Sequence, residues 1–260
     1  MNISEKAFIH PGAQIGKDVT VDPFAYIAGD VIIGDGSWIG PNATVLDGAR
    51  MGRNCKVFPG AVISAIPQDL KFAGEITSTE IGDNCTFREG ATINRGTEAM
   101  GKTVMGDNCL MMANAHVAHD CVIGNNCILV NNVMLAGEVH IDDYAIMGGG
   151  SAAHQFTRVG AHAMISGGAM FKKDIPPYSI INHDPVGYVG LNKIGLKRRG
   201  FSQHKIEEIE KIYEIIYFSG RNVTQALQYL RENFKTTDEL NYIIDFISAS
   251  SRGILKSAIR

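Results

Sequence analysis

Residues 105–135 read MGDNCLMMANAHVAHDCVIGNNCILVNNVML, and every sixth residue from Met105 to Leu135 is apolar. The same period of six extends from Ile9 to Phe171, with two interruptions. Four residues after each apolar position lies a small or β-branched residue. The residue just before that one is commonly Gly, Asn or Asp, the types that tolerate a positive φ at a corner. Most of the chain therefore follows one repeat.

A repeat of six predicts a parallel β-helix. An α-helix would repeat every 3.6 residues and an ordinary strand every two, so neither explains the pattern. Three hexads form one triangular coil, and residues 18 apart then stack about 4.8 Å from each other. Each buried aliphatic rung contributes roughly 1.5–3 kcal/mol, so the coils can form a core on their own. We expect a β-helical prism over residues 1–190 and a helical C-terminal domain over residues 191–260.

The two interruptions predict loops at about residues 64–80 and 98–104. Insertions into a solenoid protrude from it and often carry binding residues. The first loop places Gln68, Asp69 and Lys71 close together in the chain.

The repeat stops after Pro177, and helical sequence follows. Ser202 is a predicted N-cap of a helix that ends near Gly220, and a second helix is expected over about residues 223–234. Thr237 is expected to cap a third. These helices would close the C-terminal end of the prism.

Composition excludes several classes of function. The chain has a net charge of −3, with 20% charged and 45% hydrophobic residues, which is typical of a globular protein and argues against nucleic acid as its main partner. The repeat begins almost at once, which leaves no room for a signal peptide. No apolar run approaches the roughly 18 residues that a membrane helix requires. We therefore expect a cytoplasmic protein without a membrane span.

Five cysteines share the small interior position of the repeat. This placement predicts buried side chains rather than a disulfide or zinc framework. They are Cys55, Cys85, Cys109, Cys121 and Cys127.

Stacking also predicts a column of polar residues at one corner. His119 lies at a corner position, Gly137 one coil further on, and Gln155 one coil beyond that. His154 lies beside Gln155, and His116 lies on the outward side of the strand that leads to His119. Histidine suits general-base chemistry because its pKa lies near neutrality. We interpret the column as a candidate catalytic site.

Asp120 and the histidines admit two further interpretations. Asp120 could orient His119, but corner turns favour Asp in any case, so the turn is the preferred role. Histidines on β-helices can also bind zinc. No two histidines of this chain are five residues apart, as in trimeric β-helical carbonic anhydrases, so no metal site is predicted.

Several strings together resemble a known family. NAHVAHD around His119, LAG at 135–137, AHQF at 153–156, QDLKFAGE at 68–75, DIPPY at 174–178 and GLKRRGF at 195–201 resemble the UDP-N-acetylglucosamine 3-O-acyltransferases of lipid A biosynthesis. The resemblance covers essentially the whole chain. Hexads alone occur in many acyltransferases, whereas QDLKFAGE and GLKRRGF in these places are specific.

The resemblance implies a homotrimer of left-handed β-helices with active sites between neighbouring prisms. Such enzymes move an (R)-3-hydroxyacyl group from the thioester of acyl carrier protein to the 3-hydroxyl of UDP-N-acetylglucosamine, the first step of lipid A biosynthesis. By similarity, His119 would be the general base, and the backbone N–H of Gly137 would stabilise the charge on the thioester oxygen. No cofactor, metal or covalent enzyme intermediate is implied.

The same resemblance assigns the substrate contacts. The sugar nucleotide would be held by residues of the first loop, the column and the segment before the helices. From charge alone, Lys172 and Lys173 with the C-terminal helices are expected to help dock the acidic carrier protein. The assigned substrate-binding residues are Asp69, Lys71, His116, His154, Gln155, Asn192, Arg198 and Arg199.

Two positions depart from the family pattern. Glu138 stands where a histidine often follows the LAG glycine, and Ile194 stands where an acidic residue is common. Gly137 and Gly167 present no bulky side chain to close an acyl groove, which favours a long chain, although Met170 could shorten it.

Other functions remain open from the sequence. The acceptor could carry a 3-amino group, or the donor could be acetyl-CoA, because the residues do not reveal which nucleophile His119 meets. A non-catalytic β-helical scaffold would show a regular array of like residues on one face, often threonines. This chain instead concentrates unlike polar residues at one corner.

Overall fold

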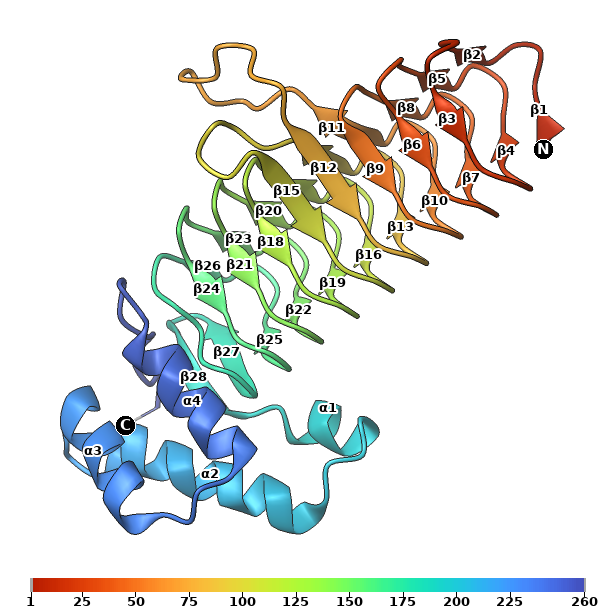
Figure 1. The fold of residues 1–260 in the computed structure, drawn as a ribbon. Helices are drawn as coiled ribbons and strands as arrows, with labels where there is room; N and C mark the ends of the chain where they lie inside the picture. Colours follow the sequence, from red (N-terminus) through yellow and green to blue (C-terminus); the bar gives the residue numbers. More distant parts are fainter. Residues whose placement is uncertain (1, 260) are drawn as a thin grey trace.

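The computed structural model describes residues 2–259, and its first two thirds form a triangular prism of parallel coils (Figure 1). Three parallel sheets form its walls. Sheet A contains β1 (Asn2–Ile3), β4 (Thr20–Val21), β7 (Trp38–Ile39), β10 (Lys56–Val57), β13 (Thr86–Phe87), β16 (Leu110–Met111), β19 (Ile128–Leu129), β22 (Ile146–Met147), β25 (Met164–Ile165), β27 (Ser179–His183) and β28 (Val186–Leu191), the last of which is antiparallel.

The other two walls are built in the same way. Sheet B contains β2 (Phe8–Ile9), β5 (Tyr26–Ile27), β8 (Thr44–Val45), β11 (Val62–Ala65), β14 (Thr92–Asn94), β17 (His116–Val117), β20 (Met134–Leu135), β23 (Ala152–Ala153) and β26 (Met170–Phe171). Sheet C contains β3 (Gln14–Ile15), β6 (Ile32–Ile33), β9 (Ala49–Met51), β12 (Ser78–Ile81), β15 (Lys102–Met105), β18 (Val122–Ile123), β21 (His140–Ile141) and β24 (Arg158–Val159).

The register follows the repeat. Val117 pairs with Leu135, and Leu135 pairs with Ala153, each 18 residues further along. All three residues are buried inside the prism. Most residues at the left-handed corners are Asn, Asp or Gly with a positive φ, as the pattern predicts.

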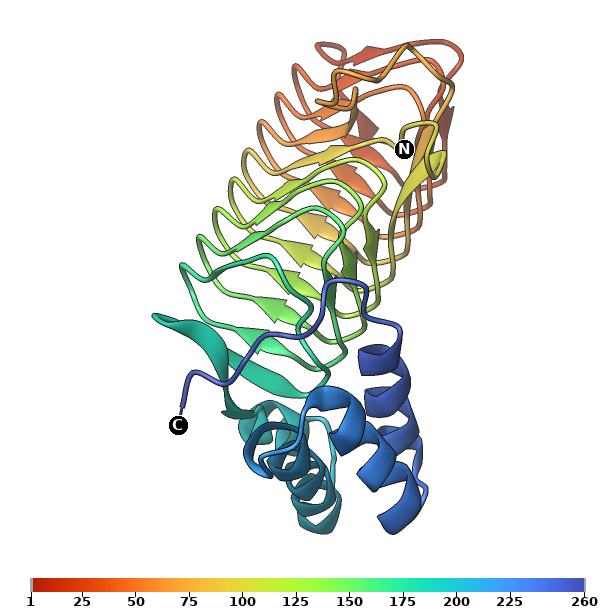
Figure 2. The ribbon, with the colours of Figure 1, turned by 90° about the vertical axis from the view of Figure 1, so that its left-hand side faces the viewer.

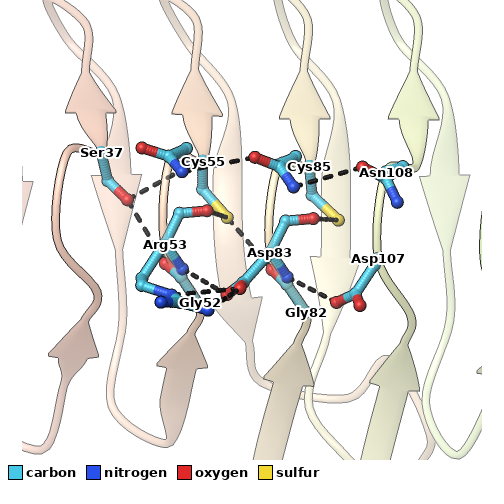
Figure 3. Close-up of polar contacts among 11 residues, drawn as sticks. Ser37, Gly52, Arg53, Cys55, Gly82, Asp83, Cys85, Asp107 and Asn108 are labelled. Carbon is cyan, nitrogen blue, oxygen red and sulfur yellow. Dashed lines mark hydrogen bonds and ion pairs between the residues drawn. The ribbon is translucent and has the colours of Figure 1, made fainter.

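Hydrogen bonds between successive coils stabilise the corner between sheets C and A (Figure 3). The Asp83 carboxylate accepts from the backbone N–H of Arg53 at 2.7 Å, and the Asp107 carboxylate accepts from the N–H of Asp83 at 2.7 Å. The Cys85 thiol donates to the carbonyl of Gly106 at 3.0 Å. The neighbouring Cys109 thiol and burial raise the pKa of Cys85 to about 12. All five cysteines are free and buried, which confirms that prediction.

Both interruptions leave the prism at the corner between sheets B and C, which we call the B–C corner. They form the two projecting loops near β11 and β15 in Figure 1. Strands run further into the predicted loop ranges than the sequence suggested, because β11, β12 and β15 pair with their neighbours at their ends. The first loop therefore covers residues 66–77. The second covers residues 95–101 and starts earlier than predicted, because β14 ends at Asn94.

In the described part of the chain, four helices pack at the C-terminal end of the prism (Figures 1 and 2). They are α1 (Lys193–Arg198), α2 (Gln203–Phe218), α3 (Val223–Asn233) and α4 (Asp238–Ser248). Ser202 and Thr237 cap α2 and α4 as predicted, through hydrogen bonds from the N–H groups of Lys205 and Leu240. The short α1 was not predicted. A final extended segment returns beside the last coils and pairs with Asp174 and Tyr188.

An aromatic stack joins the helical region to the prism. The His162 ring lies between Tyr144 and Tyr178, with centroids at 4.9 and 5.6 Å, and Phe201 contacts it edge-on. Burial and the positive charge of Arg199 lower the pKa of His162 to about 4, so this imidazole is neutral near pH 7. The stack fixes α1 against the corner between sheets C and A, the C–A corner. No helix within residues 2–259 is both long and apolar enough to cross a membrane.

Candidate active site

The predicted column is present at the B–C corner. His119 follows β17, Gly137 follows β20 and Gln155 follows β23, all strands of sheet B. The N–H of Glu138 donates to the carbonyl of His119 at 3.0 Å, and the N–H of Phe156 donates to that of Gly137 at 3.2 Å. Main-chain bonds therefore hold the three corners one rung apart. Both loops leave the prism at this same corner.

His119 is oriented by the residue that follows it. Its Nδ1 lies 2.8 Å from Oδ2 of Asp120, a fully buried side chain. An ionised carboxylate can only accept a hydrogen bond, so Nδ1 carries the proton and Nε2 of the neutral ring has a free lone pair. Asp120 also has the predicted corner conformation, with a φ of 59°. It therefore both forms the turn and orients the imidazole.

Two threonines hold Asp120 in place. Its carboxylate accepts from the N–H and the hydroxyl of Thr97 at 2.9 and 2.6 Å. The Thr103 hydroxyl accepts from its backbone N–H at 2.8 Å. Neither threonine was identified from the sequence, because Thr97 borders the interruption where the repeat gives no register.

Gly137 lies directly against the imidazole. A Cβ at this position would come within 2.5 Å of Cε1 and 2.6 Å of Nε2 of His119, so only glycine permits the observed ring position. Within residues 2–259, the N–H of Gly137 has no hydrogen-bond acceptor. An unused amide therefore lies next to the candidate base.

The first loop brings Asp69 to the other side of the ring. Oδ2 of Asp69 lies 3.8 Å from Nε2 of His119. Asp69 and Lys71 line a cavity of about 360 Å³ together with Glu75, Glu98 and Glu138. Glu138, noted in the sequence as a departure, therefore contributes a carboxylate to this cavity. Four carboxylates and one ammonium group make the cavity strongly acidic.

An apolar face runs from the column along sheet B. His116 lies outward on β17, and its Nδ1 is 2.7 Å from the hydroxyl of Thr92. Burial lowers the pKa of His116, so its ring is neutral near pH 7. Met134 and Met170 follow on later rungs of sheet B and are 48% and 66% exposed, enough to receive an apolar ligand.

A second cavity of about 360 Å³ continues this face. It is lined by Ala152, Ala153, His154, Met170, Phe171 and Lys172. His154 and Gln155 are exposed at its edge, where His154 makes only a local contact with the carbonyl of Gln155. Neighbours of the column thus line both cavities: Glu138, next to Gly137, lines the acidic one, and His154, next to Gln155, lines the apolar one.

Three predicted contacts lie elsewhere in the chain. The side chain of Asn192 caps α1 and donates to the carbonyl of His162 at 3.0 Å, at the C–A corner. Arg199 packs on the Tyr144 ring and donates to the carbonyl of Tyr144 at 3.1 Å. Arg198 is exposed on the same helix. Within one chain, these residues and His119 therefore lie at different corners.

No cluster that could ligate a metal occurs among residues 2–259. The site consists of a histidine–aspartate pair, a neighbouring amide and two cavities.

Comparisons with known proteins identify the family of the chain. Residues 174–255 match the family model of the second domain of UDP-N-acetylglucosamine O-acyltransferase, and residues 12–37, 30–65 and 102–137 match bacterial transferase hexapeptide repeats. The chain is 47% identical, over 98% of its length and 99% of the relative, to an acyl-[acyl-carrier-protein]–UDP-N-acetylglucosamine O-acyltransferase of Alkalilimnicola ehrlichii. The chain belongs to the UDP-N-acetylglucosamine O-acyltransferase family.

Solved structures of UDP-N-acetylglucosamine O-acyltransferases share its shape. The Bacteroides fragilis enzyme matches with a TM-score of 0.95 and 51% identity, over 97% of this chain and 99% of that one. The Francisella novicida enzyme also matches with a TM-score of 0.95, at 37% identity over 99% and 95% of the two chains. The predicted left-handed β-helix with a helical C-terminal region is confirmed, and the chain is an acyltransferase of lipid A biosynthesis.

Gly137→Ala tests the contact between the column residues. The added methyl group must displace the imidazole, so we expect acyl transfer to fall by about 100-fold or more, the range of a positioned general base. The melting temperature should change little, because the φ of Gly137 is not positive. Initial rates and thermal unfolding measure the two effects.

Gly149→Ala is the matched control. Its Cβ would meet only a carbonyl and an apolar carbon, at 3.3 and 3.4 Å, at a different corner. Full activity in Gly137→Ala would show that the imidazole need not occupy this position.

Proposed function

We propose that the chain transfers an (R)-3-hydroxyacyl group from acyl carrier protein to the 3-hydroxyl of UDP-N-acetylglucosamine, the first step of lipid A biosynthesis. The names of its relatives support both substrates. The oriented His119 beside the free amide of Gly137 supports the chemistry, and it is the observation on which the proposal depends. Acyl transfer needs both a base and a site for an oxyanion.

His119 acts as the base through Nε2. The sugar hydroxyl gives its proton to Nε2 as its oxygen attacks the thioester carbon. The C–S bond of the tetrahedral intermediate then breaks, and the leaving thiolate takes the proton back. Asp120 keeps the proton of Nδ1 in place and stabilises the imidazolium. No covalent bond to the enzyme forms at any step.

Gly137 receives the negative charge that develops during the attack. Its N–H has no partner within the described part of the chain, and it lies beside the ring that removes the proton. Because it is part of a corner held by main-chain bonds on both neighbouring rungs, it needs no reorganisation as the charge forms. This is the advantage of a backbone donor over a mobile side chain.

The two cavities bind different parts of the substrates. Asp69 and Lys71 hold the sugar near Nε2, and His154 and Gln155 border the sugar and nucleotide. The outward face of sheet B, from His116 towards Met170, takes the acyl chain. Gly167 lies between β25 and β26, at the corner between sheets A and B, which is the edge of sheet B opposite the column.

A complete site requires two copies of the chain. Asn192, Arg198 and Arg199, which we assign to the uridine diphosphate end, lie at the C–A corner, whereas His119 lies at the B–C corner. A neighbouring prism can bring its C–A corner to this B–C corner. Leu70 and Ile76 of the first loop are fully exposed at 105% and 99%, as expected of side chains that a second copy covers. A homotrimer provides three such contacts.

Subunit mixing tests this arrangement. His119→Ala and Arg198→Ala chains should each be inactive as pure oligomers. When the two are unfolded together and refolded, some interfaces contain an intact His119 and an intact Arg198, so activity should return to about a quarter of the wild-type value if subunits assort randomly. Light scattering should give a trimer. Mixed samples without activity would show that each chain holds a complete site.

His119→Ala tests the reaction itself. Transfer from (R)-3-hydroxyacyl carrier proteins of several chain lengths to UDP-N-acetylglucosamine should fall by about 10²–10⁴-fold, the contribution of a general base. Binding of the sugar nucleotide, measured by calorimetry, should remain. His140→Ala is the control, since His140 lies outward on sheet C. Undiminished turnover would exclude His119 as the base, and a wild-type protein without transfer would contradict the function.

The helical region offers a surface for the carrier protein. A cavity of about 790 Å³ lies between α2, α3, α4 and the final segment, and the described residues that line it include no carboxylate. Four cations border it, namely Lys173, Arg221, Arg231 and Lys256. Lys173 lies three coils beyond His119 at the same corner, about 14 Å along the prism. An acidic carrier bound here can direct its thioester towards Gly137.

Charge reversal tests this docking surface. Arg231→Glu and Lys256→Glu should each raise the KM for acyl carrier protein about tenfold, because they repel an acidic partner. Transfer from an acyl-pantetheine thioester, which lacks the protein, should be unchanged. Lys235→Glu, exposed in the same domain but outside the cavity, is the control. Equal effects on both donors would contradict docking at this cavity.

A further inference from the structure

The first loop has few contacts of its own with the prism. Of its apolar side chains, Ile66, Leu70 and Ile76 are exposed, and Gly74 has open space around it. Apart from the buried Pro67, Phe72 is the one large apolar side chain of residues 66–76 that is partly buried. The position of this loop over the active site therefore depends on what Phe72 contacts.

Phe72 packs against Arg95, the first residue after β14. The guanidinium carbon of Arg95 lies 5.5 Å from the centre of the Phe72 ring, within the range of a cation–π interaction. The Arg95 side chain spans the corner: its Nη1 donates to the carbonyl of Asp47 at 3.2 Å, and its backbone N–H donates to the carbonyl of Ala65 at 2.9 Å. Arg95 thus connects an earlier coil, the start of the loop and the loop's aromatic ring.

No ion pair accounts for this arginine. Within residues 2–259, no carboxylate oxygen lies within 4.0 Å of the Arg95 guanidinium, and its Nε is buried without a hydrogen-bond partner. Burying a guanidinium nitrogen in this way is unfavourable unless another contact compensates. The aromatic face and the Asp47 carbonyl are the contacts that compensate here.

Short hydrogen bonds continue the connection from Phe72 to the catalytic histidine. The N–H of Phe72 donates to the carbonyl of Asp69 at 3.0 Å, and the N–H of Lys71 donates to its Oδ1 at 3.0 Å. These bonds form one tight turn. The second carboxylate oxygen of Asp69 is left to face Nε2 of His119, at 3.8 Å.

We propose that Arg95 is a positioning residue for acyl transfer. Acting through Phe72, it holds the turn that presents Asp69 and Lys71 to the sugar beside His119. It touches neither substrate itself. The effect on catalysis rests on the proposed function, whereas the effect on the loop does not.

Kinetics with Arg95→Met and Phe72→Ala test the catalytic role. Each change should raise the KM and the dissociation constant for UDP-N-acetylglucosamine about tenfold, the order of a partly desolvated cation–π contact. The KM for acyl carrier protein should stay within about twofold. Arg95→Lys and Phe72→Tyr should restore most of the affinity, because both keep a cation or an aromatic face. The double variant should be no worse than the poorer single one, since both remove the same contact.

A second arginine–phenylalanine pair supplies the matched control. The guanidinium carbon of Arg88 lies 4.6 Å from the centre of the Phe58 ring. Both residues directly follow strands of sheet A, so this pair lies away from the B–C corner. Arg88→Met and Phe58→Ala should leave both KM values unchanged. A general loss of stability would instead affect both substrates and appear in both pairs of variants.

Amide hydrogen exchange tests the tether without any substrate. Residues 68–73 should exchange about tenfold faster in Arg95→Met and Phe72→Ala than in the wild type, with the coils unchanged. Faster exchange in a protein that transfers no acyl group would support the tether and contradict the proposed function. Unchanged exchange, or additive effects in the double variant, would overturn the role of Arg95.

Discussion

Main-chain hydrogen bonds between successive coils fix the distance between residues 18 positions apart wherever no loop interrupts the repeat. The N–H of His116 donates to the carbonyl of Val133, and the N–H of His154 donates to that of Phe171, each across one rung. The hydrogen bonds that stack the apolar residues of successive coils therefore also align the corners of those coils. A histidine and an amide can be held in contact here without any side-chain packing dedicated to the purpose, because the constraint that builds the core also builds the column.

The same ladder of main-chain hydrogen bonds explains where the fold tolerates inserted residues. Extra residues between β11 and β12 leave at a corner, and Ile81 then resumes the register against Met51 and Met105. The local cost is a shift in the pairing of Ile63 and Ala65 with β14. Inserted loops can thus change the contacts around a site while the coils beneath it remain intact.

The sequence predicted what the repeat determines. The column, the buried cysteines and the helix caps at Ser202 and Thr237 all follow from period and local chemistry, and the structure has them. The contacts of Asp120 could not be predicted, because Thr97 borders an interruption that carries no register. The sequence also does not show that Arg199 packs on Tyr144 while Arg198 is exposed, because this difference depends on how α1 packs against the prism. The stacking of Tyr144 and His162 could have been predicted. The two residues are 18 positions apart, so the repeat places their rings on successive coils of the same corner.

The charges of the site support a division of the sugar nucleotide between two subunits. The cavity beside His119 contains Asp69, Glu75, Glu98 and Glu138 against a single lysine, so a diphosphate placed there would be repelled. Sugar hydroxyls, by contrast, can donate to carboxylates. The diphosphate must then extend towards cations outside this cavity, and Arg198 at the C–A corner is exposed and free of any ion pair in the described chain. In the proposed function, the arginine that meets the phosphates comes from a neighbouring copy, because the ladder keeps the two corners of one prism apart. The acidic cavity and the fixed geometry of the prism are thus two independent observations that support the proposed shared site.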